Sequence, residues 1–436
     1  MSQPSLHRTV DLKSAIFILI GFIVGSTIFV LPGTLAVDAG PAVFLAYMFA
    51  GIPAIFSCFV MAQVGGAFPT SGACYSIISK VLSPYWGFIY IWTMISLAAL
   101  VIPLVAFGFA DYLQHFLPGA NVTLISVLII VLFVITNCLG MDFSAHVQML
   151  LVLCFLAALV IFGVSGVVQG DPLLIRPIMP NGLSPVVIAA ITAYFSYAGV
   201  FVIAEIAGEV KEPGKTIPRA ILISFAVVIL IYTLVPLALV MTLPWQDYAD
   251  TNMAVITASE FLLPAWLVNF IAFGALFAAA TSINGLLMGL SRDFYKGADV
   301  NLFPSYFSKV SGRTATPRRA VFAVGALSMI GVIGGGSIKE YVQVAVLGLM
   351  VTQIITGISV LKMPNVLPEV YQNSYFKLNK QSLTFFSWGT ILFSAAFFLY
   401  LGAESPKAIV AGTIYIIIGS VYFRKRVLDV ILEQAN

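Results

Sequence analysis

Charged residues are scarce in this sequence, and their scarcity excludes a soluble globular protein. Only 9% of the 436 residues are charged, while 60% are apolar and the mean hydropathy is +1.04. Soluble domains carry roughly a quarter charged residues. So few charges cannot cover the surface of soluble domains of this total length. We therefore expect a polytopic membrane protein whose main partner is the lipid bilayer.

Cysteine, histidine and net charge are low as well, and each excludes a class of site. The three histidines fall outside the interiors of the apolar runs and neither HExxH nor GxSxG occurs, which disfavours an enzyme within the membrane. A net charge of +3 provides no basic patch for nucleic acid. The cysteines show no CxxC spacing, so we expect packing residues, no metal and no cofactor at Cys58, Cys74, Cys138 and Cys154.

Apolar runs long enough to cross a bilayer as helices recur along the whole chain. The polar residues before Lys13 are followed by no cleavage site, so we expect no removable signal peptide. The sequence predicts twelve spans, at 14–36, 42–67, 85–110, 122–140, 146–168, 186–208, 219–243, 264–291, 319–337, 341–361, 383–402 and 407–424.

The distribution of Lys and Arg predicts the orientation of these spans. With an even number of spans, both termini lie on one side, and 18 of the 21 basic residues fall on that side. Cytoplasmic loops carry the excess of Lys and Arg in membrane proteins. We therefore expect a multi-pass protein of the plasma membrane with both termini in the cytoplasm, leaving outside only Arg176, Lys339 and Lys407.

Small residues interrupt the first span at 25–29 and the sixth span at 195–201. The two interruptions are five spans apart, so two five-helix halves would insert with opposite orientation, as in transporters built from inverted repeats. Glycines that merely allow close helix packing are the alternative. The predicted organisation is a cytoplasmic N-terminus (1–13), a first repeat (14–168), a second repeat (186–361), two extra helices (383–424) and a cytoplasmic C-terminus (425–436).

A broken helix within lipid creates a binding site, because its freed backbone groups must face a ligand, a cavity or other protein. The amides at the start of a half-helix can hold a carboxylate, and the carbonyls that end the preceding half-helix can hold a cation. A zwitterion such as an amino acid fits both.

Several motifs extend this interpretation from the breaks to the whole chain. In order they are Gly25-Ser26-Thr27-Ile28-Phe29, Pro69-Thr70-Ser71-Gly72-Ala73-Cys74-Tyr75, Tyr197-Ala198-Gly199, Gly208-Glu209-Val210-Lys211-Glu212-Pro213, Ile217-Pro218-Arg219-Ala220-Ile221, Ser291-Arg292-Asp293, Leu302-Phe303-Pro304 and Thr316-Pro317. As an ordered set over residues 10–425, they resemble the amino acid–polyamine–organocation transporters, or amino acid permeases.

The resemblance implies an all-helical, leucine-transporter-like fold with broken first and sixth helices, and it implies a substrate site. The carboxylate would meet the backbone amides of Gly25, Ser26, Thr27 and Ile28. The amino group and side chain would meet Ala198, Gly199 and Val200, and Phe195 would be a gating aromatic or a plain packing residue. Thr27 replaces the family's usual glycine, so it adds a hydroxyl ligand or narrows the pocket.

Sodium-coupled relatives of this fold hold an ion between the first and eighth helices, and this sequence has matching groups. They are the carbonyls of Gly21, Val24 and Ala278 and the hydroxyls of Thr281 and Ser282. The alternative is that both hydroxyls bond back to a carbonyl one turn earlier. Many sodium-independent members carry a lysine in span five instead. Span five here contains no lysine at all, and the matching position, seven residues after Gln148, is Phe155.

A proton is the other candidate for a coupling ion. Glu205 is the only carboxylate well inside a predicted span, which makes it a functional candidate. Its position one turn from Glu209 also allows a structural role, reaching inner water or pairing with a cytoplasmic Arg or Lys.

The function predicted from these observations is alternating-access transport of amino acids by a monomer or homodimer. No carboxylate lies in either break, which favours a small or medium neutral substrate over a cationic one. Proton-coupled transport, exchange and polyamine transport remain alternatives. A non-transporting amino-acid sensor is a remote alternative, and a channel is disfavoured by the paired breaks.

Overall fold

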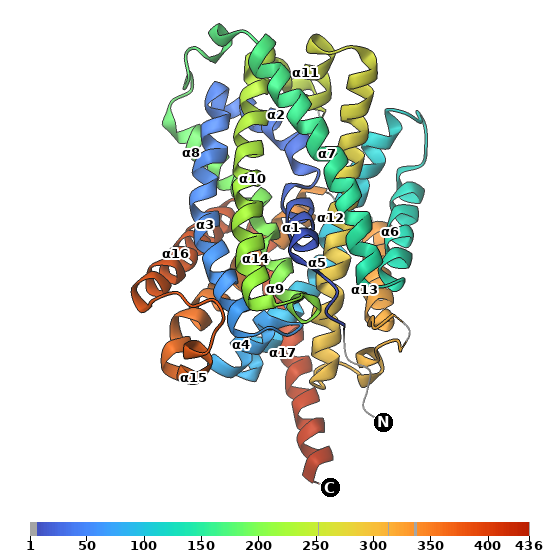
Figure 1. Cartoon of the computed structure of the whole chain (residues 1–436), viewed down its shortest axis with the longest axis vertical. Coiled ribbons are helices and arrows are strands. Elements are labelled where there is room, and N and C mark those ends of the chain that lie inside the picture. Colours follow the sequence, from blue (N-terminus) through green and yellow to red (C-terminus); the bar gives the residue numbers. More distant parts are fainter. Residues whose placement is uncertain (1–6, 252, 313, 335–337, 436) are drawn as a thin grey trace.

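The computed structural model describes residues 7–251, 253–312, 314–334 and 338–435. It does not describe the side chains of residues 198, 201, 202, 250, 338–342 and 427–435. The described chain is all helical, with one isolated bridge between Val10 and Val210 and no strand. The long helices form an elongated bundle, and both termini lie at one end of it (Figure 1). We call this end the terminal end.

The first half of the chain begins with a helix in two pieces, α1 (Leu12–Val24) and α2 (Thr27–Ala39). Short 3-10 turns at Gly40–Ala42 (η1) and Pro172–Ile175 (η2) join some of the helices that follow. These helices are α3 (Val43–Ala67), α4 (Ala73–Val81), α5 (Pro84–Gln114), α6 (Val122–Cys138) and α7 (Met141–Gln169).

The second half also begins with an interrupted helix, made of α8 (Leu183–Tyr194), the 3-10 segment η3 (Phe195–Phe201), α9 (Val202–Glu205) and η4 (Ala207–Glu209). The rest comprises α10 (Pro213–Thr242), η5 (Trp245–Asp250), α11 (Ala254–Leu262), α12 (Ala265–Asp299), η6 (Ser305–Ser308), α13 (Arg318–Gly334), α14 (Ile338–Val366), α15 (Pro368–Gln372), α16 (Lys380–Glu404) and α17 (Pro406–Ala435).

Eight helical stretches of the described chain are long and apolar enough to span a membrane. One of them, Leu12–Ala67, contains the first two predicted spans, and two shorter apolar helices lie at the predicted fourth and sixth spans. The predicted ninth span falls on α13. The chain is thus an integral membrane protein with many helices, and the full count of twelve stays a prediction.

Side-chain caps fix where several helices begin. A side-chain oxygen that accepts from an amide in the first turn satisfies one of the free donors there. The Asp11 carboxylate accepts from the Ser14 amide (2.8 Å) at the start of α1, and Asn121 and Asn379 act in the same way at α6 and α16. Each cap sets the register of the apolar helix that follows it.

Burial decreases from α12 to the last two helices. Of the most apolar window of each helix, 83% is buried in α12, 28% in α16 and 11% in α17. Amide side chains hold α12 in the centre: Asn284 accepts from Asn137 (2.8 Å) and donates to Gln148 (2.9 Å), and Gln148 donates to the Thr281 carbonyl (3.1 Å). Buried amides need such partners, so this chain ties α6, α7 and α12 together.

Candidate functional site

Gly25 produces the break in the first helix. It ends α1 with φ 49° and ψ −162°, a backbone conformation that disfavours residues with a Cβ. A Cβ at this position would also meet the Ser282 hydroxyl of α12. Helix α2 restarts at Thr27, so its first amides have no partner within the helix and face the break with partial positive charge.

The break in the sixth helix is a change of helix type. Residues 195–201 form the 3-10 helix η3 between α8 and α9. A 3-10 helix bonds each amide three residues back, and such a stretch within a longer helix is often functional. Gly199 lets the two breaks touch, because a Cβ there would run into the backbone of Ile23 in α1.

Tyr232 of α10 joins the two breaks. Its buried hydroxyl lies 2.8 Å from the Ile23 carbonyl, 3.3 Å from the Val24 carbonyl and 3.0 Å from the Ser196 carbonyl. Carbonyls released from helical bonding must find a donor inside a membrane protein. The single O–H of Tyr232 thus lies within hydrogen-bonding distance of carbonyls from both broken helices.

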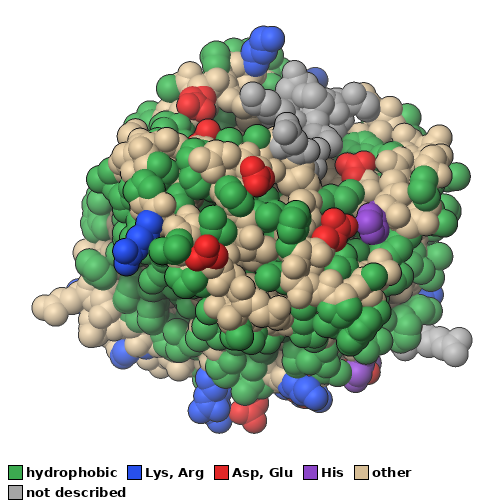
Figure 2. All heavy atoms as spheres, turned by 90° about the horizontal axis from the view of Figure 1, so that it is seen from above, with side chains coloured by type: hydrophobic (Ala, Val, Ile, Leu, Met, Phe, Trp, Pro, Cys, Tyr) green, Lys and Arg blue, Asp and Glu red, His purple; other side chains and the backbone are tan. Residues whose placement is uncertain are grey.

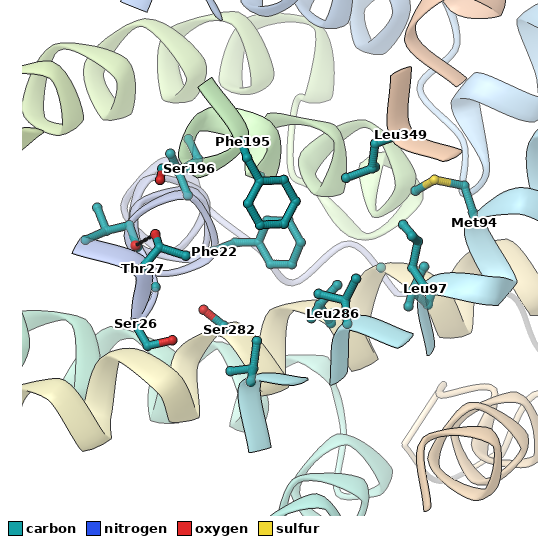
Figure 3. Close-up of a pocket in the computed structure, with 18 of the residues that line it drawn as sticks. Phe22, Ser26, Thr27, Met94, Leu97, Phe195, Ser196, Ser282, Leu286 and Leu349 are labelled. Carbon is teal, nitrogen blue, oxygen red and sulfur yellow. Dashed lines mark hydrogen bonds between the residues drawn. The ribbon is translucent and has the colours of Figure 1, made fainter. Parts of the chain in front are cut away.

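A cavity of about 100 Å³ lies at the two breaks. Figure 3 shows Phe22 and Phe195 pointing into it, with Ser26, Thr27 and Ser282 on one side and leucines of α5, α12 and α14 on the other. Of the predicted substrate residues, those that line the cavity are Gly25, Ser26, Thr27, Phe195 and Gly199.

The other predicted substrate residues lie elsewhere. Ile28 and Val200 are buried but are not part of the cavity wall. The side chain of Ala198 lies outside the described part of the structure. Ile28 can still present its backbone amide at the start of α2, which is the group assigned to it.

Polar groups without partners mark this cavity as a place for a ligand. The hydroxyl of Ser196 lines the wall, is buried, and has no hydrogen-bond partner in the described chain. A buried polar group without a partner costs free energy. Together with the amides at the start of α2, it can bind a small polar or zwitterionic molecule whose apolar part contacts Phe22 and Phe195.

The predicted ion ligands come together only in part. The Thr281 hydroxyl lies 3.1 Å from the Gly21 carbonyl and 2.7 Å from the Ala278 carbonyl, and the Ser282 hydroxyl lies 3.3 Å from the latter. The Val24 carbonyl instead accepts from Thr27 (3.2 Å) and from Tyr232. In this state both hydroxyls use the back-bonding arrangement.

Two further groups connect the cavity with the terminal end. Glu205 lines the cavity, is buried, and accepts a 2.6 Å bond from the Tyr90 hydroxyl of α5. Below it, buried Arg292 of α12 donates two bonds to Glu209 of η4, at 2.7 and 2.9 Å. We call Arg292 and Glu209 the inner ion pair. Glu205 is buried and, within the described residues, forms no ion pair, whereas Arg292 pairs with Glu209; the choice between a coupling role and a structural role for Glu205 stays a prediction.

The sequence alone assigned no role to four residues at this site, although Ser196 lies within the predicted break at 195–201. Tyr232, Tyr90, Ser196 and Asp293 stand in apolar or loop-like surroundings, and their importance comes from partners far away in the chain. For Asp293 a signal was present, since it is an acidic residue within a motif that follows the eighth span. Asp293 also lines the cavity, fully buried.

A cavity at two touching helix breaks, within a bundle that exposes apolar side chains, is the architecture of a membrane transporter. The match to known proteins gives the particular family. The amino acid permease family matches residues 10–422, and the chain belongs to this family. The resemblance to the amino acid–polyamine–organocation transporters is thereby confirmed.

Similar proteins include the branched-chain amino acid permease BcaP of Bacillus subtilis, 26% identical over 348 residues, or 75% of each chain. The methylthioribose transporter of Bacillus subtilis is 27% identical over 391 residues, or 84% of each chain. The cystine/glutamate transporter of Homo sapiens is 29% identical over 348 residues, or 76% of this chain and 69% of that one. These relatives are transporters and permeases rather than enzymes.

Proposed function

We propose that the protein is a secondary transporter that moves neutral amino acids of small to medium size across the membrane by alternating access. The observation that carries this proposal is the cavity at the two helix breaks, with free amides at the start of α2 and an unpaired Ser196 hydroxyl beside apolar walls. An amino acid carries a carboxylate for the amides, an ammonium group for the carbonyls of η3 and an apolar side chain for the walls.

The proposed architecture is a five-plus-five inverted repeat of twelve spans in total. Its support is that each half begins with an interrupted helix and that the two interruptions meet. Helices α16 and α17 would lie outside the repeats, in agreement with their low burial. Whether they join two copies of the chain decides between the proposed monomer and homodimer.

We place the protein in the plasma membrane with both termini in the cytoplasm. Both termini lie at one end of the bundle (Figure 1). Acidic side chains are scattered across the centre of the opposite face, and Lys and Arg lie towards its edge (Figure 2). The predicted spans assign 18 of the 21 basic residues to the side of the termini, which is the cytoplasmic pattern.

The names of the relatives support a neutral substrate without deciding it. BcaP is named for branched-chain amino acids, whereas others are named for cystine and glutamate or for cationic amino acids. Asp293 lies eleven residues beyond Ser282 on α12, which is about 16 Å along a helix. That is farther than the side chain of one amino acid bound at the breaks extends, so we assign Asp293 no contact with such a substrate.

We propose sodium as the coupling ion, at the site of Gly21, Val24, Ala278, Thr281 and Ser282. The close approach of the Thr281 hydroxyl to the Gly21 carbonyl supports this proposal, because oxygens of α1 and α12 already meet there. Neutral oxygens suit a hard monovalent cation. Thr281→Ala and Ser282→Ala should abolish any sodium dependence of substrate binding, and retained dependence would place the ion elsewhere.

Proton coupling, exchange and polyamine transport stay as alternatives, and a sensor without transport is a remote one. A cavity that contains Glu205 and extends towards Asp293 favours the proton among these alternatives. A long polyamine, unlike a single amino acid, would also bridge the distance between the breaks and the two carboxyl groups.

The experiment that tests the proposed function is a thermal-shift screen of the detergent-purified protein. Each of the common amino acids is added in sodium and again in choline, because a ligand that binds the folded state raises its apparent stability. We expect shifts with neutral amino acids that grow in sodium and that weaken in Ser196→Ala. A salt-independent shift would reject sodium coupling. A shift with polyamines alone would reject amino acids as substrates.

A further inference from the structure

Two carboxyl groups face each other at the terminal end of the cavity. Glu205 is on α9 and Asp293 is on α12, and both line the cavity wall. Their exposed fractions are 1% and 0%. The two carboxyls lie close enough to interact electrostatically, and no hydrogen bond between them forms among the described atoms. We call Glu205 and Asp293 the carboxyl pair.

The carboxyl pair has too few hydrogen-bond donors for two negative charges. The Tyr90 hydroxyl serves one oxygen of Glu205, Oε1, at 2.6 Å. The other Glu205 oxygen and both Asp293 oxygens have no partner in the described part of the chain. Three fully buried acceptors without a donor are exceptional, because each costs free energy.

Basic residues do not compensate the pair either. The adjacent Arg292 is held by Glu209 through two bonds, and Lys296, one turn further along α12, is paired with Asp299. Among the described residues, the Cys74 thiol of α4 and the Tyr90 hydroxyl of α5 also interact with the pair. Within the described residues, neither member of the pair is part of an ion pair.

A single proton resolves this arrangement. Two adjacent carboxylates in a buried site repel each other, whereas one carboxylic acid and one carboxylate attract through an O–H···O⁻ bond. The proton also supplies the donor that the described side chains do not. We propose that the carboxyl pair binds one shared proton, taken up from water at the terminal end, and that this proton holds α9 against α12.

The position of the pair gives this proton a role in transport, a step that rests on the proposed function. The inner ion pair joins α12 to η4, the segment that follows α9, from Arg292 to Glu209. Both contacts lie between the breaks and the terminal end of α12. Loss of the proton leaves two like charges across the contact, so it favours separation of α9 from α12 and access to the cavity from the terminal end.

Infrared difference spectroscopy tests the proton directly, without any substrate. The purified protein is titrated between about pH 5 and about pH 9, and the C=O stretch of a buried carboxylic acid is recorded. We expect this band in the wild type at neutral pH. Asp293→Asn should remove it, because Glu205 keeps the Tyr90 donor and gains an amide donor. Asp111→Asn, at an exposed position near the end of α5, is the matched control and should keep it.

Two results would overturn the shared proton. The first is a wild type without the acid band at neutral pH, which needs no variant to fold. The second is a band that survives both Asp293→Asn and Glu205→Gln. Because no amino acid is added, either result is independent of the thermal-shift screen and of the proposed substrate.

The buried Cys74 thiol beside the pair reports on the opening of this end. In a variant whose other cysteines are alanine, its rate of modification by a maleimide is measured with and without Asp293→Asn. Raising the pH accelerates thiol chemistry with and without the substitution. The rate with Asp293 present, divided by the rate in Asp293→Asn, therefore reports on the opening. We expect the ratio to rise about tenfold per pH unit once the pair loses its proton. A ratio that stays flat would separate the proton from the opening and reject its role in access.

Discussion

Removing the hydroxyl of Tyr232 should loosen both helix breaks while leaving the packing intact. In Tyr232→Phe the ring keeps its edge-on contacts with Tyr47 and Tyr197, whose centroids lie 5.4 and 4.8 Å away. The carbonyls of Ile23 and Ser196 lose their donor in a buried site. One unsatisfied buried group costs about 1–3 kcal/mol. We expect this loss in the free energy of unfolding, measured by denaturation in detergent.

Ligand binding should weaken in the same variant, because the geometry of both breaks depends on the lost bonds. A difference of about 1.4 kcal/mol corresponds to a tenfold change in affinity. Tyr47→Phe is the matched control: Tyr47 is equally buried in the same ring cluster, but its hydroxyl has no hydrogen bond in the described part of the chain. If the two variants lose equal stability, the Tyr232 bonds do not hold the breaks together.

Three further changes should have defined effects. Gly25→Ala forces a Cβ into a positive-φ position, so it should lower the free energy of unfolding by about 1–2 kcal/mol and weaken ligand binding. Gly108→Ala, in open space on α5, is the control and should be neutral or stabilising in the same denaturation assay. Equal losses in the two variants would contradict the strain at Gly25. Arg292→Met leaves a buried carboxylate unpaired and should cost about 3–5 kcal/mol, and the double variant with Glu209→Gln should recover part of this in the same assay. The pKa of Asp11 is lowered by a hydrogen bond from the backbone amide of Ser14. The cap therefore stabilises the fold above the unfolded-state pKa, and this contribution is lost as the pH falls through the lowered pKa. In Asp11→Asn the free energy of unfolding should depend less on acid pH than in the wild type.

The helix breaks could be predicted from the sequence because lipid restricts what a chain can do. Gly25 and Gly199 stand in apolar runs where an open backbone has few solutions, so their position alone indicates a site. The structure adds the reason for each: a positive φ at Gly25 and a close approach of two backbones at Gly199. The family could likewise be predicted, because its motifs lie in the breaks and in the loops that follow them.

Residues whose function depends on a partner could not be predicted in the same way. Tyr232 looks like any aromatic residue of an apolar helix, and only the packing of α10 against α1 and η3 places its hydroxyl at their carbonyls. Glu205 was predicted as a candidate, but its partner Asp293 lies 88 positions away and on another helix. The carbonyl of Val24 accepts from Tyr232 of α10, a contact between distant segments that helical spacing does not specify.

The contact of Gly199 with the backbone of Ile23 has a mechanical consequence. Two backbones that touch without intervening side chains leave no room for one to slide past the other, and the Tyr232 hydroxyl fastens both to α10. When the first broken helix tilts, the sixth must therefore tilt with it as one rigid unit. We therefore expect the two broken helices to move together relative to α12. The hinge of this motion would lie where the Thr281 hydroxyl of α12 contacts the Gly21 carbonyl of α1.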